Sequence, residues 1–143
     1  MSETIAALER LAAKHGATLG NLARADLQVA LALATLCLPV DATCTEPEVN
    51  VALKGWLAGA GAMLRIDHVE LRRTLIDFGL WQRDGYGRAY RRAPSIGDAE
   101  LARHVEALRA IDAGAIVAAV RERRAADHAR RKALNDATRS GGS

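Results

Sequence analysis

Apolar side chains at helical spacing open the chain. Ile5, Leu8 and Leu11 fall on one stripe of a helix, and Gly16 is placed to end that helix. The pattern predicts an N-terminal helix within residues 1–20.

A second helical pattern starts at Thr18 or Asn21 and is apolar nearly all round after Val29. A helix that is apolar on all sides is buried rather than laid on a surface. Pro39 forces its end, because the residue before a proline avoids the helical region. Residues 41–44 form a connector that could contain a short first strand.

Two further helices carry capping patterns at their starts. Thr45 and Glu48 form a T-x-x-E capping box, and Asp67 with Glu70 repeats the spacing. The residues expected on the buried stripes of these helices are Val49, Leu53, Trp56, Leu57, Leu71, Leu75 and Phe78.

A β-hairpin is predicted directly after the second of these helices, which Gly79 ends. Segments 80–84 and 89–92 have the pattern of short strands. They flank the run 84–87, which begins with Asp-Gly, a strong hairpin signal.

The chain is helical again after Pro94. Asp98 can cap a helix, and Gly114 either breaks or only weakens it. An apolar stripe runs along this segment through Leu101, Val105, Leu108, Ile116 and Val120. The stripe fits packing within the chain or pairing with a second subunit.

These elements predict a mainly α protein, built on a winged helix-turn-helix module. The module has three helices and a β-hairpin wing, with extra N- and C-terminal helices. The expected division is an N-terminal helix (1–20), the winged-helix module (21–94), a C-terminal helical extension (95–139) and a flexible tail (140–143).

The central stretch resembles a bacterial family of winged-helix-like domains of unknown function. That family occurs alone or appended to arsenic-repressor-type transcriptional regulators. The residues that carry the resemblance are Thr45-Glu46, Glu48-Val49-Asn50, Leu53, Asp67, Leu71-Arg72-Arg73, Leu75, Asp77, Gly79-Leu80, Arg83, Gly85, Tyr90 and Arg92. The gap between Leu53 and Asp67 is longer than is usual in the family, and the helices after Pro94 have no counterpart in it. The resemblance implies a fold and a regulatory neighbourhood, but no catalytic residue.

Double-stranded DNA is the partner that this fold predicts. The helix 67–78 would enter the major groove and the basic wing 81–92 would lie on the phosphate backbone. The residues expected to contact DNA are His68, Arg72, Arg73, Thr74, Arg83, Tyr86, Arg88, Arg91 and Arg92. Flanking helices often join such regulators into dimers, so a homodimer through the C-terminal helices is expected.

Internal salt bridges are the alternative role for the central arginines. Arg73 can pair with Asp77 four residues on, and Arg72 can pair with Glu46 or Glu48. The protein would then be a protein-interaction module that grips a partner with its apolar flanking helices.

The C-terminal segment 121–139 holds seven basic residues against three acidic ones. Such a helix can bind the phosphate backbone without sequence preference. The residues expected in this arm are Arg121, Arg123, Arg124, Arg130, Arg131 and Lys132. The interspersed acids also fit a solvated helix face with surface ion pairs.

Composition and charge argue against several other classes of protein. The net charge is only +3, and the apolar run 29–38 is far shorter than the ~20 residues that a membrane span needs. Cys37 and Cys44 form neither a disulfide framework nor a zinc signature, although they leave a metal- or thiol-sensing role as a minor alternative. Glu100 and His104 lie four residues apart without a third metal ligand. We therefore expect a cytoplasmic protein without a membrane contact, bound metal, cofactor or enzymatic activity.

Overall fold

The computed structural model describes residues 2–86 and 88–141. Within them the chain is mainly helical, with a small antiparallel sheet. The elements are α1 (Ser2–Ala12), a 3₁₀ turn η1 (Leu19–Asn21), α2 (Arg24–Thr35), β1 (Cys44–Thr45), α3 (Glu46–Ala58), α4 (His68–Asp77), β2 (Trp81–Arg83), β3 (Ala89–Arg92), α5 (Ala99–Arg109) and α6 (Ala113–Gly141).

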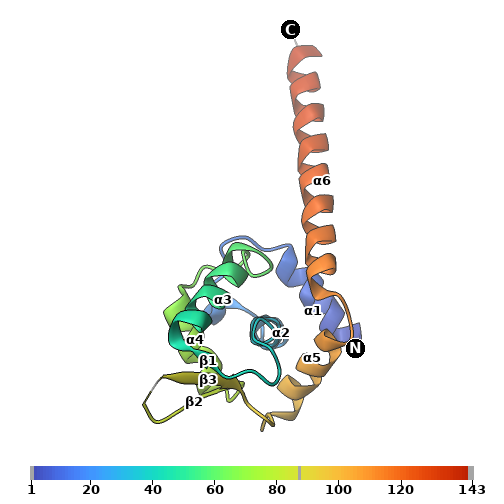
Figure 1. Cartoon of the computed structure of the whole chain (residues 1–143). Coiled ribbons are helices and arrows are strands. Elements are labelled where there is room, and N and C mark those ends of the chain that lie inside the picture. Colours follow the sequence, from blue (N-terminus) through green and yellow to red (C-terminus); the bar gives the residue numbers. More distant parts are fainter. Residues whose placement is uncertain (1, 87, 142–143) are drawn as a thin grey trace.

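Helix α2 is the centre of the molecule and is seen end-on in Figure 1. It packs against α1 and α5, while α1 also packs against α6. Its residues from Val29 to Ala34 are all buried, as the all-round apolar pattern predicts. A single hydrophobic core therefore joins the central elements to both terminal extensions.

The second helix begins and ends further inside its predicted span. The expected start, Thr18 or Asn21, lies at η1, and α2 begins only after Ala23. At the other end, Leu36 and Cys37 donate to carbonyls three residues back, so the last turn tightens before Pro39 is reached.

The three strands form one sheet in the order β1-β3-β2. Both neighbouring pairs are antiparallel, with Cys44 opposite Tyr90 and Trp81 opposite Arg92. The β2–β3 hairpin extends away from the helices as a wing, at the lower left of Figure 1. Residue 87, at the predicted turn, lies outside the described residues.

Phe78 was predicted to point inward, and this prediction is wrong. Leu71 and Leu75 are fully buried, but Phe78 is 45% exposed. The helix closes at Phe78, and Gly79 takes a positive φ of 73° that redirects the chain. Leu80 and Trp81 occupy the core in its place.

The C-terminal segment is two helices, and the break precedes Gly114. The Asp112 carboxylate accepts the backbone N–H of Ala115 at 3.0 Å and starts a new helix. Helix α6 continues to Gly141 and projects from the body, upward in Figure 1. The predicted tail 140–143 is thus helical as far as it is described, and residues 142–143 lie outside the described part. Across the described residues, no helix is long and apolar enough to cross a bilayer.

Candidate nucleic-acid interface

Helix α4 corresponds to the predicted sequence-reading helix, and Asp67 sets its start. The Asp67 carboxylate accepts the backbone N–H of Glu70 at 2.8 Å, which confirms the predicted cap. Arg73 is exposed, while His68 and Thr74 are half-buried. The Thr74 hydroxyl donates to the Glu70 carbonyl at 2.8 Å. Arg73 is therefore the cation that this helix presents to solvent.

Arg72 points into the protein. Its guanidinium lies 3.0 Å from the Glu46 carboxylate and donates to the Asn50 side chain at 2.6 Å. The same group lies 5.5 Å from the centroid of the Tyr90 ring, a cation–π contact. The side chain is only 15% exposed. Arg72 therefore forms the internal ion pair with Glu46 that was the alternative to DNA contact. Together, its contacts join α3, α4 and β3.

The exposed face of α4 is more acidic than basic. Asp67, Glu70 and Asp77 are exposed beside Arg73. No ion pair between Arg73 and Asp77 is present among the described residues, although their spacing allows one. Most of the exposed cations on this side of the molecule therefore lie on the wing rather than on α4.

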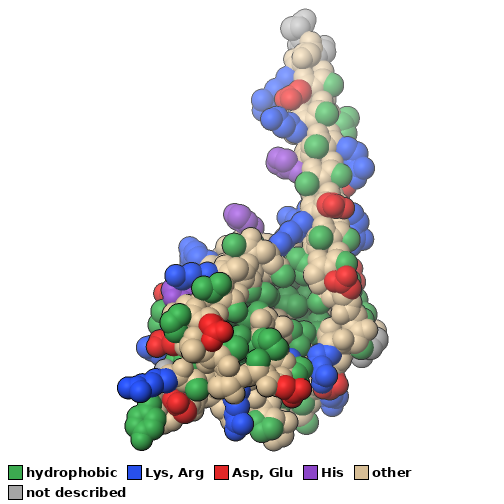
Figure 2. Space-filling view, in the orientation of Figure 1, with side chains coloured by type: hydrophobic (Ala, Val, Ile, Leu, Met, Phe, Trp, Pro, Cys, Tyr) green, Lys and Arg blue, Asp and Glu red, His purple; other side chains and the backbone are tan. Residues whose placement is uncertain are grey.

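The wing owes its shape to Asp84. Its carboxylate accepts the backbone N–H groups of Tyr86 at 3.1 Å and Arg88 at 2.9 Å. Arg83 and Arg88 are exposed, and Tyr86 is 86% exposed. Figure 2 shows basic side chains beside a hydrophobic one at the end of the wing, at the lower left. Two cations and an aromatic ring therefore share one projecting tip.

Arg91 and Arg92 point to opposite faces of the sheet, because successive strand residues alternate. Arg91 donates to the Gln82 side chain at 3.2 Å on the outer face. Arg92 lies opposite the buried Trp81 and is half-buried. Burial, with the nearby charge of Arg109 adding to it, lowers the pKa of Arg92. The arginines predicted for the wing thus divide between the tip, the outer face and the body.

Residues 22–92 match the DUF2087 family. The family is described as an uncharacterized protein conserved in bacteria. No curated protein and no solved structure matches the chain. The resemblance to a bacterial family of unknown function is confirmed for this segment, and α1, α5 and α6 lie outside it.

Three of the predicted arm residues are engaged within the chain. Arg121 donates to the carbonyls of Gly59 at 2.8 Å and Ala60 at 3.3 Å, where α3 ends. Arg123 lies 3.8 Å from the carboxylate of Glu9 in α1. Arg130 pairs with an aspartate one turn earlier in its own helix. The contacts of Arg121 and Arg123 join the first part of α6 to the DUF2087 segment and to α1, whereas the Arg130 pair lies within α6 itself.

The other basic residues of α6 share one side of the helix. At 3.6 residues per turn they fall within about 100° of its circumference. The exposed cations on this stripe are Arg124, Arg131, Lys132 and Arg139, with His128 between them. Figure 2 shows Lys and Arg side chains along the projecting helix. Arg139 was not predicted, although its spacing of seven from Lys132 is the signal that would have identified it.

Two other candidate sites from the sequence are the cysteines and the pair Glu100 and His104, and the structure places Cys37, Glu100 and His104 in contacts within the fold. Burial raises the pKa of the Cys37 thiol to about 12, which keeps it protonated and unreactive. His104 is buried, and its Nδ1 shares a 2.7 Å hydrogen bond with the Thr4 hydroxyl. Glu100 binds Gln28 and Arg24. No group of three or more metal-ligating side chains converges anywhere in residues 2–86 and 88–141.

Proposed function

We propose that this chain is a DNA-binding transcriptional regulator of winged-helix type, not an enzyme, that acts in the bacterial cytoplasm without a cofactor. The observation that carries the proposal is the projecting β2–β3 wing, whose tip exposes Arg83, Tyr86 and Arg88. The order α2-β1-α3-α4-β2-β3 is also the order of a winged helix. The relation of the family to arsenic-repressor-type regulators belongs to the same proposal.

In this proposal the wing supplies most of the phosphate contact. Arg83 and Arg88 would pair with backbone phosphates, and Tyr86 would pack against the sugar-phosphate chain at the tip. Arg73 would be the main base contact of α4, because a guanidinium can donate two hydrogen bonds to guanine in the major groove. Arg72 would orient α4 from inside the protein.

The basic stripe of α6 would act separately from the wing. Figure 1 places α6 and the wing on opposite sides of the body. One short duplex lying along the wing and α4 would therefore not follow α6. The stripe would bind a neighbouring stretch of backbone, and its attraction would depend on salt rather than sequence.

A homodimer through the C-terminal helices would use the exposed part of α6. The apolar stripe expected to join two subunits is buried in the chain itself, including Leu101, Val105, Leu108 and Val120. Because these residues are buried, they are also not available to bind a partner in the alternative, a protein-interaction module. That alternative keeps one observation in its favour, the internal engagement of Arg72.

The test is fluorescence anisotropy with a labelled duplex from the upstream region of the gene, beside a scrambled duplex, over a salt series. The double variant Arg83→Ala/Arg88→Ala should weaken binding and flatten the salt dependence by about two units of log–log slope, since each phosphate contact contributes about one.

The matched control removes the same charge from elsewhere on the surface. Lys14→Ala/Arg103→Ala changes two exposed cations off the wing and should leave the slope within half a unit of wild type. Equal slopes for the two double variants would refute the wing assignment. Absence of wild-type binding at low salt would refute DNA binding and favour the protein-interaction module.

A further inference from the structure

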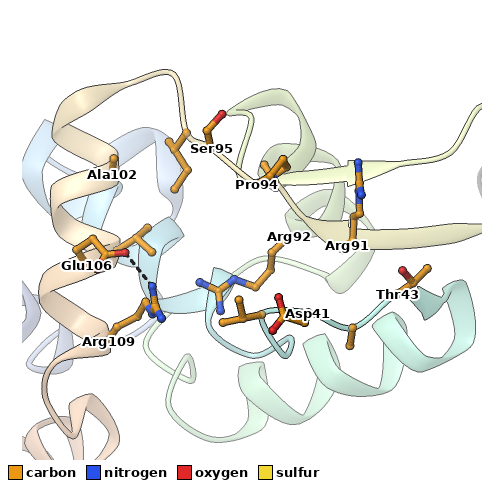
Figure 3. A pocket seen from close by; sticks show the side chains of 14 residues that line it. Asp41, Thr43, Arg91, Arg92, Pro94, Ser95, Ala102, Glu106 and Arg109 are labelled. Atoms are coloured by element: carbon orange, nitrogen blue, oxygen red, sulfur yellow. Dashed lines mark hydrogen bonds and ion pairs between the residues drawn. The ribbon is translucent and has the colours of Figure 1, made fainter.

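A cavity of about 540 Å³ lies where the DUF2087 segment meets α5. One wall comes from residues 40–43 and from strand β3. The other comes from residues 93–96 and from α5 (Figure 3). The volume falls within the range of small-molecule sites, and such sites often lie between structural units. This cavity is separate from α4, the wing tip and α6.

Two arginines from different elements face this cavity. Arg92 reaches in from β3 and Arg109 from α5, and in Figure 3 their guanidinium groups point toward one another. Arg109 has a counter-ion, since it lies 2.9 Å from the Glu106 carboxylate. Arg92 has no ion pair with any described residue. Asp41 also lines the cavity and is exposed.

Such an arrangement is electrostatically unfavourable when the cavity holds only water. Arg92 is half-buried beside a like charge, and both effects lower its pKa, while the nearby Glu106 carboxylate acts in the opposite direction. An anion between the two guanidinium groups would relieve the repulsion and supply the missing counter-ion. The planar fork of arginine is suited to bind a carboxylate or a phosphate with two hydrogen bonds.

The rest of the lining is partly apolar. Val105 is buried on α5, and Ile96 is partly buried in the connection after β3. Val40 and Ala102 also belong to this apolar part of the lining, together with Ala42, Ala93 and Pro94. A ligand that fills the cavity therefore needs an apolar body as well as an anionic head.

We propose that this cavity binds a small organic anion, with its carboxylate or phosphate between Arg92 and Arg109 and its apolar body against Ile96 and Val105. The site does not depend on the DNA-binding proposal, because its residues are distinct from the wing tip and from Arg73. Binding would bridge β3 and α5, so it would join the DUF2087 segment to the C-terminal helices.

The test is a titration followed by ¹H–¹⁵N NMR on the full chain at low salt. Benzoate and phenyl phosphate serve as probes with an apolar body, and the two arms distinguish a carboxylate from a phosphate. Benzamide is the neutral control probe. We expect saturable shifts in the amides of residues 91–93, 95–96 and 105–109 with at least one anionic probe, and none with benzamide.

Variants then test the two arginines. Arg92→Gln and Arg109→Gln should each weaken binding of the responding probe by about tenfold. Arg109 is exposed on α5, so its variant keeps the test valid if Arg92→Gln fails to fold. Arg103→Gln is the matched control, because Arg103 is an exposed arginine of α5 that does not line the cavity, and its loss should change affinity less than about twofold.

Three results would overturn the proposal. The first is that neither anionic probe produces saturable shifts in the wild-type protein. The second is that benzamide binds as well as benzoate, which would show that the arginines do not select the ligand. The third is that Arg103→Gln weakens binding as much as Arg109→Gln, which would indicate only a general effect of net charge.

Discussion

Arg72 offers the sharpest test of how this fold uses its arginines. Its guanidinium joins three elements at once, through Glu46 of α3, Asn50 of α3 and the Tyr90 ring of β3. If these contacts stabilise the fold, Arg72→Ala must lower the free energy of unfolding. If Arg72 instead serves to contact a ligand, its removal should leave stability unchanged.

The expected loss can be estimated contact by contact. Glu46 is 45% exposed, so water replaces much of the lost ion pair and we assign it about 0.5 kcal/mol. The charged hydrogen bond to Asn50 adds about 1 kcal/mol, and the cation–π contact with Tyr90 adds about 0.5–1 kcal/mol. The sum is about 2–2.5 kcal/mol. For a protein of this size it corresponds to a decrease in Tm of about 6–9 °C.

The assay is thermal and chemical unfolding followed by far-UV circular dichroism. Arg73→Ala is the matched control, because it removes the same side chain from the next position, where it is exposed. It should change stability by less than about 0.5 kcal/mol. Arg72→Lys should fall between wild type and Arg72→Ala, since lysine keeps the charge but loses the fork. An Arg72→Ala protein that unfolds at the wild-type temperature would refute the reasoning.

Three further predictions concern other parts of the chain. Gly61→Ala should lower the free energy of unfolding by about 1–3 kcal/mol, because the new Cβ would lie 2.4 Å from ring carbons of Trp56. An unchanged midpoint of denaturant unfolding would contradict this. Hydrogen bonds from the backbone N–H and the side chain of Thr45 lower the pKa of Glu48 in the folded protein. The ionised carboxylate therefore stabilises the fold above the ordinary pKa of 4.5, and this stabilisation is lost as the pH falls through the lower folded-state pKa. The Tm advantage of wild type over Glu48→Gln should therefore shrink on acidification, whereas a constant difference would argue against the linkage. Cys37 should resist alkylation by iodoacetamide in the native protein at mildly alkaline pH and react on unfolding, since partial burial raises its pKa to about 12. Fast labelling of Cys37 in the native protein, located by peptide mass mapping, would contradict this raised pKa.

The candidate site was predictable where it depends on local geometry. The capping residues Thr45, Asp67 and Asp98 were identified correctly, because each accepts a backbone N–H three residues further along the same chain. The hairpin followed from the Asp-Gly pair for the same reason. Both kinds of signal lie within a few consecutive residues, so no distant contact is needed to read them.

The roles of the arginines were not predictable in the same way. Arg72 and Arg73 are neighbours of the same type in one helix, yet one is enclosed and the other is exposed. Helical geometry separates their directions by about 100°, and only the packing of α3 and β3 against α4 decides which direction is inward. Arg121 shows the same dependence, because its partners at Gly59 and Ala60 are some sixty residues away.

By itself, the sequence determined the kinds of element in this protein, their order, and the caps that start α3, α4 and α5. Periodicity and capping are properties of short stretches of chain, and they act before distant segments meet. Only the tertiary structure decided that Phe78 stays outside, that Arg72 is enclosed while Arg73 is exposed, and that Arg92 and Arg109 face one cavity. Those outcomes depend on which surfaces are covered once the helices have packed on α2, and burial is a property of the whole assembly of elements rather than of any one of them.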